Sequence, residues 1–257
     1  QDLITLLERS HEEITVISLC VYDRVRKSFL AIVVPKVGEW SIATINRFYL
    51  NSQFQMPHPR NSKKRKRGGK VEDTAWEKRG AISLELCSTG QHETPISLGL
   101  LNTHLDVYDK QQKTGALQAR ECSDVVSKTN TNFQILGGDL NSLKAEDYPD
   151  DFWHFTKLAD LSRGFTHQNL TTTTLTSLGW TDSADSVPNQ GSIGRESSCW
   201  SLRRPDFIWF SNSAGDWIDD VKSKIHHDLR LSDHMPLSLS FTLSPLTSSP
   251  TSINSPT

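Results

Sequence analysis

The pattern of hydrophobic and polar positions predicts a chain of short β-strands with a few helices between them. Apolar runs at 14–22 and 29–34 flank a polar turn at 23–27, so they predict an antiparallel hairpin. Residues 80–86 and 96–102 predict a second pair of strands joined by a polar connection. The remaining segments with strand character are 132–138, 205–210, 221–227 and 237–243, the last with period-two alternation.

Helical periodicity appears in three places. Residues 114–128 form the best amphipathic helix, because small and apolar side chains recur there near helical spacing. Residues 3–9 resemble the end of a helix, and 148–161 predict another. We expect the large apolar side chains of this last helix to pack in the core: Phe152, Trp153, Phe155 and Leu158.

Three segments show no periodicity. Residues 171–198 are rich in Thr, Ser, Asn and Gly and predict a loop or insertion. Residues 244–257 contain mostly Ser, Thr and Pro, which predicts a disordered tail. Residues 57–78 are expected to form an exposed basic loop, because they hold a dense run of Lys and Arg without core-forming positions.

The basic loop concentrates seven positive charges between Arg60 and Lys70, with five of them at 63–67 and no acidic residue among them. The net charge of the whole chain is −2, so the remainder carries −9. Three functions compete for this loop: a solvated insertion, a nuclear localisation signal, or an arm that contacts phosphates. A solvated insertion is the simplest interpretation, and nuclear import is the next.

Composition is that of an ordinary globular protein, with 257 residues, 35% hydrophobic and 23% charged. No apolar stretch approaches the roughly 20 residues that a membrane-spanning helix needs, and no signal peptide is visible. The four cysteines have no metal-binding or disulfide-like spacing, which favours a reducing compartment. We therefore expect an intracellular protein, with the nucleus as a candidate because of the 63–67 cluster.

The most informative polar residues follow the strand 132–138. Asp139 and Asn141 come directly after two glycines, and an extended backbone would point both side chains to the same face. A carboxylate can ligate a divalent cation, and a carboxamide can hydrogen-bond a phosphate and a water. A simple Gly-Gly-Asp turn is the alternative for this stretch taken alone.

Similar polar clusters adjoin other predicted strands. Asn102, His104 and Asp106 follow one strand, Asp206 begins another, and Asp233 with His234 precedes the last. Carboxylates and imidazoles that meet at one rim of a sheet form the kind of site that hydrolyses phosphate esters. Each cluster alone is equally consistent with ordinary surface turns.

Taken together, the motifs resemble the endonuclease/exonuclease/phosphatase superfamily, whose fold is that of deoxyribonuclease I. The resemblance is carried by Asn102-Thr103-His104-Leu105-Asp106, Gly138-Asp139-Leu140-Asn141, Arg204-Pro205-Asp206-Phe207 and Ser232-Asp233-His234, and Arg79-Gly80-Ala81 also fits. It implies an α/β fold, a four-layered sandwich with two mostly antiparallel sheets face to face and helices outside. This domain would occupy residues 1–243 and precede the tail.

The resemblance also implies roles for individual residues. Asp139 and Asn141 would position the nucleophilic water and the scissile phosphate, and Asp206 would hold His234. His234 would be the general base or a phosphate-binding imidazole. The remaining roles are a phosphate contact for His104, support of the rim by Asn102, and a magnesium site (Mg²⁺, with Mn²⁺ as an alternative) at Asp233 and Asp139.

One part of the family pattern is missing. Members open with a strand that carries a catalytic Asn, followed by a strand whose final Glu ligates Mg²⁺. Glu12 and Glu13 precede a predicted strand instead of ending one, so neither replaces that ligand. We therefore expect a domain that lacks the family's first strands, either as a fragment or as a degenerate member with weak metal affinity.

The substrate is less defined than the fold. The motifs are similar to tyrosyl-DNA phosphodiesterase-like members, which implies a metal-dependent phosphodiester hydrolase acting on DNA or a DNA adduct, and the basic loop suits nucleic acid. The first alternative is a phosphatase or phospholipase that acts on a lipid or inositol phosphate, because the rest of the chain is acidic. The second alternative is a non-catalytic remnant that binds a partner. We expect a monomer.

Overall fold

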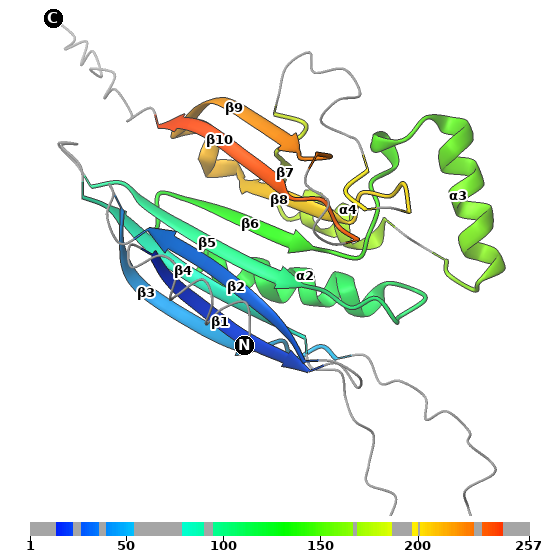
Figure 1. The fold of residues 1–257 in the computed structure, drawn as a ribbon, viewed down its shortest axis with the longest axis horizontal. Helices are drawn as coiled ribbons and strands as arrows, with labels where there is room; N and C mark the ends of the chain where they lie inside the picture. Colours follow the sequence, from blue (N-terminus) through cyan, green and yellow to red (C-terminus); the bar gives the residue numbers. More distant parts are fainter. Residues whose placement is uncertain are drawn as a thin grey trace, which may run out of the picture.

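A six-stranded mixed sheet forms the centre of the protein (Figure 1). The computed structural model describes residues 14–22, 27–35, 40–53, 79–89, 95–166, 169–186, 197–199, 201–228 and 233–243. In spatial order the strands are β3 (Trp40–Tyr49), β4 (Gly80–Ser88), β5 (Ser97–His104), β6 (Phe133–Asp139), β8 (Asp206–Ser211) and β7 (Trp180–Asp182). Only the neighbours β5 and β6 are parallel in this sheet.

Two antiparallel hairpins cover one face of this sheet. The first consists of β1 (Ile14–Tyr22) and β2 (Lys27–Pro35), which contact β4 and β5. The second consists of β9 (Ile218–Ile225) and β10 (Leu237–Leu243), and β10 contacts β8. The buried side chains in this layer include Leu30, Ile82, Leu84, Phe133 and Phe210. Burial of these apolar side chains is the main force that holds the hairpins against the sheet.

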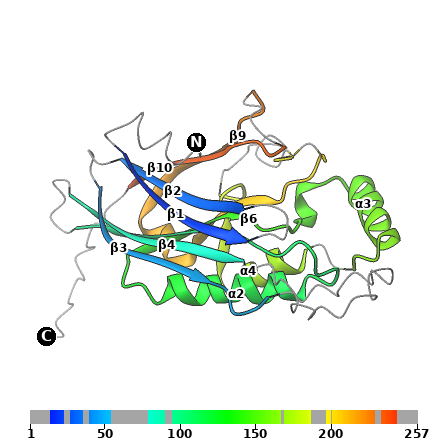
Figure 2. The same cartoon turned by 60° about the horizontal axis from the view of Figure 1, so that its bottom comes forward.

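Helices cover the opposite face. Figure 2 shows α2 (Lys113–Ser127) running beneath the sheet, with α4 (Leu170–Ser177) beside it. A parallel pair of strands needs a crossover connection, and α2 supplies it between β5 and β6. The second core lies here and includes Leu101, Cys122, Leu136, Leu175 and Trp209. Among the described helices, none has the length and apolar character needed to cross a lipid bilayer.

Most of the predicted elements are confirmed. The first hairpin, the 80–86 and 96–102 strand pair, the amphipathic helix and the four later strands all occur near the predicted bounds. The predicted α/β sandwich is also confirmed, with helices on the outer side of the six-stranded sheet. The predictions for 3–9, 57–78 and 244–257 lie outside the described residues.

The prediction of a loop at 171–198 is wrong for its first part, which forms α4 and β7. Threonine is a weak helix former, so the sequence pattern gave no helical signal. In the structure, the hydroxyls of Thr173 and Thr174 donate to carbonyl groups of the preceding turn, and Leu175 is fully buried. Packing against α2 therefore overrides the low intrinsic propensity of this segment.

Strand β3 was not predicted. The register of its pairing with β4 shifts between Ile42 and Thr44, which marks an irregularity that interrupts the period-two pattern.

The expected core packing of α3 (Asp150–Ser162) is also wrong in part. Phe155 and Leu158 are 68% and 53% exposed, because the helix buries the opposite side around Thr156 and Asp160. Trp153 and Phe152 stack on Tyr148 instead.

The burial of the second core predicts that two Leu→Ala variants differ clearly in their free energy of unfolding. Leu175→Ala should lower the free energy of unfolding by about 2–5 kcal/mol, because it opens a cavity beneath the sheet. Leu158→Ala removes the same atoms from an exposed position of α3 and should change the free energy of unfolding by less than about 0.5 kcal/mol. Chemical denaturation of both variants measures the difference, and equal losses would contradict this assignment of the core.

Candidate active site

The ends of β5, β6 and β8 bring three chemically active side chains into one row. The parallel ladder pairs His104 with Asp139, and the antiparallel ladder pairs Asp139 with Asp206. Residues paired across adjacent strands point to the same face, so these three side chains are neighbours at the rim of the sheet. Segments far apart in the sequence thus form a single cluster.

The pairing of β5 with β6 depends on a glycine. A Cβ atom at Gly138 would lie 1.9 Å from the backbone oxygen of Thr103, and the φ angle of Gly138 is 140°. Such a contact is far closer than any side chain tolerates, and this φ value is also unfavourable for residues with a Cβ. Gly138 therefore allows the close approach of strands that places His104 beside Asp139.

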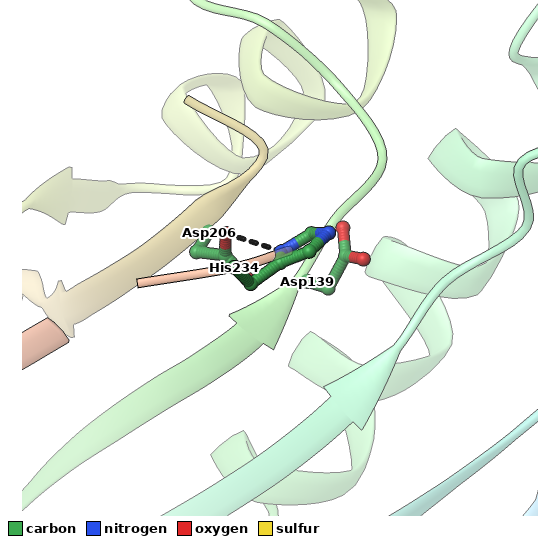
Figure 3. Close-up of side chains that lie close together, drawn as sticks. All are labelled: Asp139, Asp206 and His234. Atoms are coloured by element: carbon green, nitrogen blue, oxygen red, sulfur yellow. Dashed lines mark hydrogen bonds and ion pairs between the residues drawn. The ribbon is translucent and has the colours of Figure 1, made fainter. Parts of the chain in front are cut away.

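His234 joins the row from the segment that precedes β10. Its Nδ1 lies 2.8 Å from Oδ2 of Asp206, and Figure 3 shows its ring between Asp206 and Asp139. The backbone position of His234 is fixed by an isolated antiparallel bridge to Cys199. Ser198 also holds Asp206, because its hydroxyl donates to the same Oδ2 at 2.7 Å.

The contact with Asp206 controls the charge of His234. This hydrogen bond raises the pKa of His234 to about 9, against the opposing effect of burial. The imidazole is therefore protonated at neutral pH and donates from both ring nitrogens. Such a group can bind a phosphoryl oxygen or act as a general acid.

Asp139 occupies the centre of the row. Burial and the neighbouring charge of Asp206 raise the pKa of Asp139 to about 6. Its Oδ2 lies 3.4 Å from Nε2 of His104, and its Oδ1 accepts the backbone N–H of Asn141 at 2.9 Å. Two crowded carboxylates form a site that a cation would stabilise.

His104 differs from His234 in its charge. Burial, followed by the positive charges of Arg79 and His234, lowers the pKa of His104 to about 3. His104 is therefore neutral at pH 7, and its contact with Asp139 is not an ion pair of two full charges. The two histidines of the rim thus have different protonation states.

The structure brings together one possible set of metal ligands among the described residues. Each of Asp139, Asp206 and His234 has one potential ligand atom here, and these three atoms lie within 4.8 Å of one another. His234 is protonated and therefore offers no lone pair to a metal, which leaves the two carboxylates as ligands. Mg²⁺ usually keeps several waters and binds one or two carboxylates, so Asp139 and Asp206 fit a hydrated divalent ion. Asp233, the other predicted ligand, is exposed and does not belong to this set.

Asn141 does not extend from the strand as expected. The strand ends at Asp139, and Asn141 has a φ angle of 47°, so the two side chains are not in the i, i+2 relation of an extended strand. The side chain of Asn141 donates to the backbone oxygen of Leu105 at 3.0 Å. The prediction of a shared face is therefore wrong, although the backbone N–H of Asn141 does contact the carboxylate of Asp139.

The other residues predicted at the rim have different surroundings. Asn102 lies two residues before His104 on the same face of β5. Asp106 is buried and accepts the backbone N–H groups of Tyr108 and Asp109, so it stabilises the turn after β5.

A cavity of about 240 Å³ opens beside the row. His234 and Asn141 form part of its wall, which also includes Phe165, Arg163 and Arg203. Arg203 also forms an ion pair with Asp160 at 2.8 Å. The cavity gives a substrate group room next to the candidate catalytic side chains.

Sequence analysis missed three residues near the site. Ser198 is the last residue of the predicted insertion and Cys199 follows it directly, and their contacts with Asp206 and His234 had no local signal. Arg79 was noted only as part of a motif, but it is buried and its charge lowers the pKa of His104.

Comparisons with known proteins show the fold. No family model matches the chain, and no curated protein matches its sequence. Among solved structures, it is similar to TDP2 from Caenorhabditis elegans, with a TM-score of 0.55 and 15% identity over 93% of this chain and 60% of that one. This chain thus spans less than two thirds of that relative.

Two bacterial proteins are similar to the same extent. An endonuclease/exonuclease/phosphatase family protein from Bacteroides thetaiotaomicron has a TM-score of 0.56 and 14% identity, over 92% of this chain and 75% of that one. The 3′–5′ exonuclease NExo from Neisseria meningitidis has a TM-score of 0.55 and 15% identity, over 94% and 84%. The chain therefore has the fold of the endonuclease/exonuclease/phosphatase proteins, as the motifs predicted.

The tight contact at Gly138 predicts that this position accepts no side chain. Gly138→Ala should lower the free energy of unfolding by roughly 2 kcal/mol or more, because β5 and β6 must separate to admit the methyl group. Gly137→Ala is the matched control, since its Cβ would lie 3.6 Å from the nearest atom. A similar loss of stability in both variants would contradict the role given to Gly138.

The pKa of His234 should depend on Asp206. In Asp206→Asn, the pKa of His234 should fall from about 9 toward its ordinary value of 6.5, as measured by NMR titration of the ring protons. Because the folded state raises this pKa, protonated His234 stabilises the fold fully below pH 6.5, and the contribution is lost as the pH rises through about 9. Asp124→Asn, which removes an exposed carboxylate from α2, should leave the pKa of His234 near 9. An unchanged pKa in Asp206→Asn would be the contrary result.

Proposed function

We propose that this protein is a phosphodiester hydrolase that acts on DNA or a DNA adduct by in-line attack of an activated water. The observation that carries the proposal is the row of His104, Asp139, Asp206 and His234 across one sheet rim. It combines a protonated imidazole, a neutral imidazole and two crowded carboxylates, which are groups that phosphate ester hydrolysis uses.

His234 is the residue that faces the phosphate in this mechanism. Asp206 holds its Nδ1, so the ring is fixed in orientation and its Nε2–H is available as a donor toward Asp139 and the substrate. A protonated imidazole stabilises the negative charge that builds on the phosphoryl oxygens in the transition state. It can also give a proton to the departing oxygen.

Asp139 is ionised above its pKa of about 6, so it orients the attacking water and accepts the proton that the water loses. It would also hold a divalent metal ion together with Asp206. When bound, Mg²⁺ or Mn²⁺ would supply charge neutralisation at the phosphoryl oxygens and lower the pKa of a bound water. The crowding that raises the pKa of Asp139 to about 6 is the observation that favours a cation at this point. His104 remains neutral and donates or accepts a hydrogen bond beside Asp139.

DNA is the preferred substrate for two reasons. A structure of NExo, described there as a 3′ phosphatase from Neisseria, holds a product DNA hairpin, and this chain has the same fold. In addition, seven Lys and Arg residues between Arg60 and Lys70 could contact phosphates without regard to base sequence. Both arguments point to nucleic acid.

A small phosphorylated molecule is the second candidate substrate. The 240 Å³ cavity beside His234 has two arginines, Arg163 and Arg203, in its wall together with three carboxylates, Asp106, Asp109 and Asp160. The chain outside the basic cluster carries a net charge of −9, which disfavours a polyanionic substrate such as DNA. A phosphatase or phospholipase of the same fold would use the same row of residues. A panel of DNA, inositol phosphates and sphingomyelin separates the candidates.

Activity should require both metal and Asp139. The chain should hydrolyse bis-p-nitrophenyl phosphate in the presence of Mg²⁺ or Mn²⁺, and Asp139→Asn should reduce the rate at least about 100-fold, because it loses the charge that orients water and metal. Circular dichroism confirms that the variant is folded. Asp124→Asn changes an exposed carboxylate of α2 that belongs to none of these contacts and should retain activity. Equal rates with and without the Asp139 carboxylate would rule out the proposed site.

A further inference from the structure

Arg204 lies two residues before Asp206, the first residue of β8, and its side chain is completely buried. A buried guanidinium is costly unless all its partners are well placed. Here Nη1 and Nη2 donate to the two carboxylate oxygens of Asp182 at 2.7 and 2.8 Å, and Nη1 also donates to Asp147 at 2.9 Å. The guanidinium lies over the ring of Phe207, 4.4 Å from its centroid.

These partners belong to separate segments. Asp182 ends β7 at the edge of the sheet, and Asp147 lies in the short helix that follows the Asp139 loop. The backbone N–H of Arg204 donates to the hydroxyl of Tyr148 at 2.8 Å. Arg204 therefore connects three parts of the chain: the start of β8, the end of β7 and the segment that leaves β6.

The same segments carry the candidate catalytic side chains. Asp139 and Asp206 are paired across β6 and β8, and the backbone N–H of Leu140 donates to the oxygen of Pro205 at 2.9 Å. Arg204 and the carboxylates that it binds thus hold the segment that enters β8 and the segment that leaves β6, next to the Asp139–Asp206 pair. A shift of Arg204 would move Asp206 away from Nδ1 of His234.

The pair of Arg204 and Asp182 is held in its charged form. Burial opposes the ionisation of Asp182, but the hydrogen bonds and charge of Arg204 hold the pKa of Asp182 below its ordinary value. The two parallel hydrogen bonds to Asp182 need a planar guanidinium, which a lysine cannot reproduce. The geometry therefore requires arginine at this position, and a positive charge alone is not sufficient.

We infer that Arg204 is a positioning residue, which uses its ion cluster with Asp147 and Asp182 to align Asp206 with His234. This inference rests on the proposed function only for its effect on catalysis. Its structural effect, the alignment of the His234 ring, can be measured whether or not the chain is an active hydrolase.

The test compares Arg204→Lys and Arg204→Met with Asp182→Asn, a milder change that preserves volume. The ring ¹⁵N chemical shifts of His234 report whether Nδ1 still carries a proton held by Asp206. They are recorded for every variant at the same pH and at a temperature below all of the melting temperatures. We expect all three variants to lose the wild-type shifts, with Asp182→Asn the least affected. Leu175→Ala is the control for instability alone, because it weakens the second core and leaves every charged side chain of the ion cluster in place.

The outcomes separate the two claims. Wild-type ring shifts in folded Arg204→Lys or Arg204→Met would overturn the positioning role, as would equal changes in Leu175→Ala. If the wild-type chain hydrolyses phosphodiesters, kcat in Arg204→Lys should fall about 100-fold with little change in KM, because a small misplacement of reacting groups has this effect. If it does not, the proposed function fails, and the ring shifts still decide the role of Arg204.

Discussion

The close approach of β5 and β6 at Gly138 is the constraint on which the site depends. Only a residue without a Cβ fits against the backbone of Thr103, and this contact sets the register that places His104 beside Asp139. The next ladder then places Asp206 on the other side of Asp139. The chemistry of the rim is therefore a consequence of strand packing, which is itself held by the two cores on either side of the sheet.

Crowding of like charges gives the rim its electrostatic character. Asp139 and Asp206 raise the proton affinity of their surroundings, so His234 is protonated, whereas His104 is kept neutral by burial and by Arg79. A divalent cation would offset the negative charge of the two carboxylates, and an anionic phosphate would offset the positive charge of His234. Burial of the Asp139 carboxylate beside Asp206 costs folding free energy, which is common for sites that bind charged ligands.

Local pattern predicted the strands and the amphipathic helix well, because their periodicity reflects burial on one face. The four motifs predicted the fold, and they contain the residues that meet at the rim, His104, Asp139, Asp206 and His234. They also contain Asn141 and Asp233, whose predicted positions in the site are wrong. The turn at Asn141 and the support of Asp206 by Ser198 could not be predicted, because both depend on hydrogen bonds between distant segments. Helix α4 was missed for a similar reason, since tertiary packing and not propensity stabilises its threonines.

The most direct measurement is a crystal structure of the chain with Mn²⁺ and a short single-stranded DNA, using the anomalous signal to locate the metal. The account predicts a manganese peak at the carboxylate of Asp139 and a DNA phosphate within hydrogen-bond distance of His234. Metal and phosphate bound elsewhere, with the rim of β5, β6 and β8 empty, would contradict it.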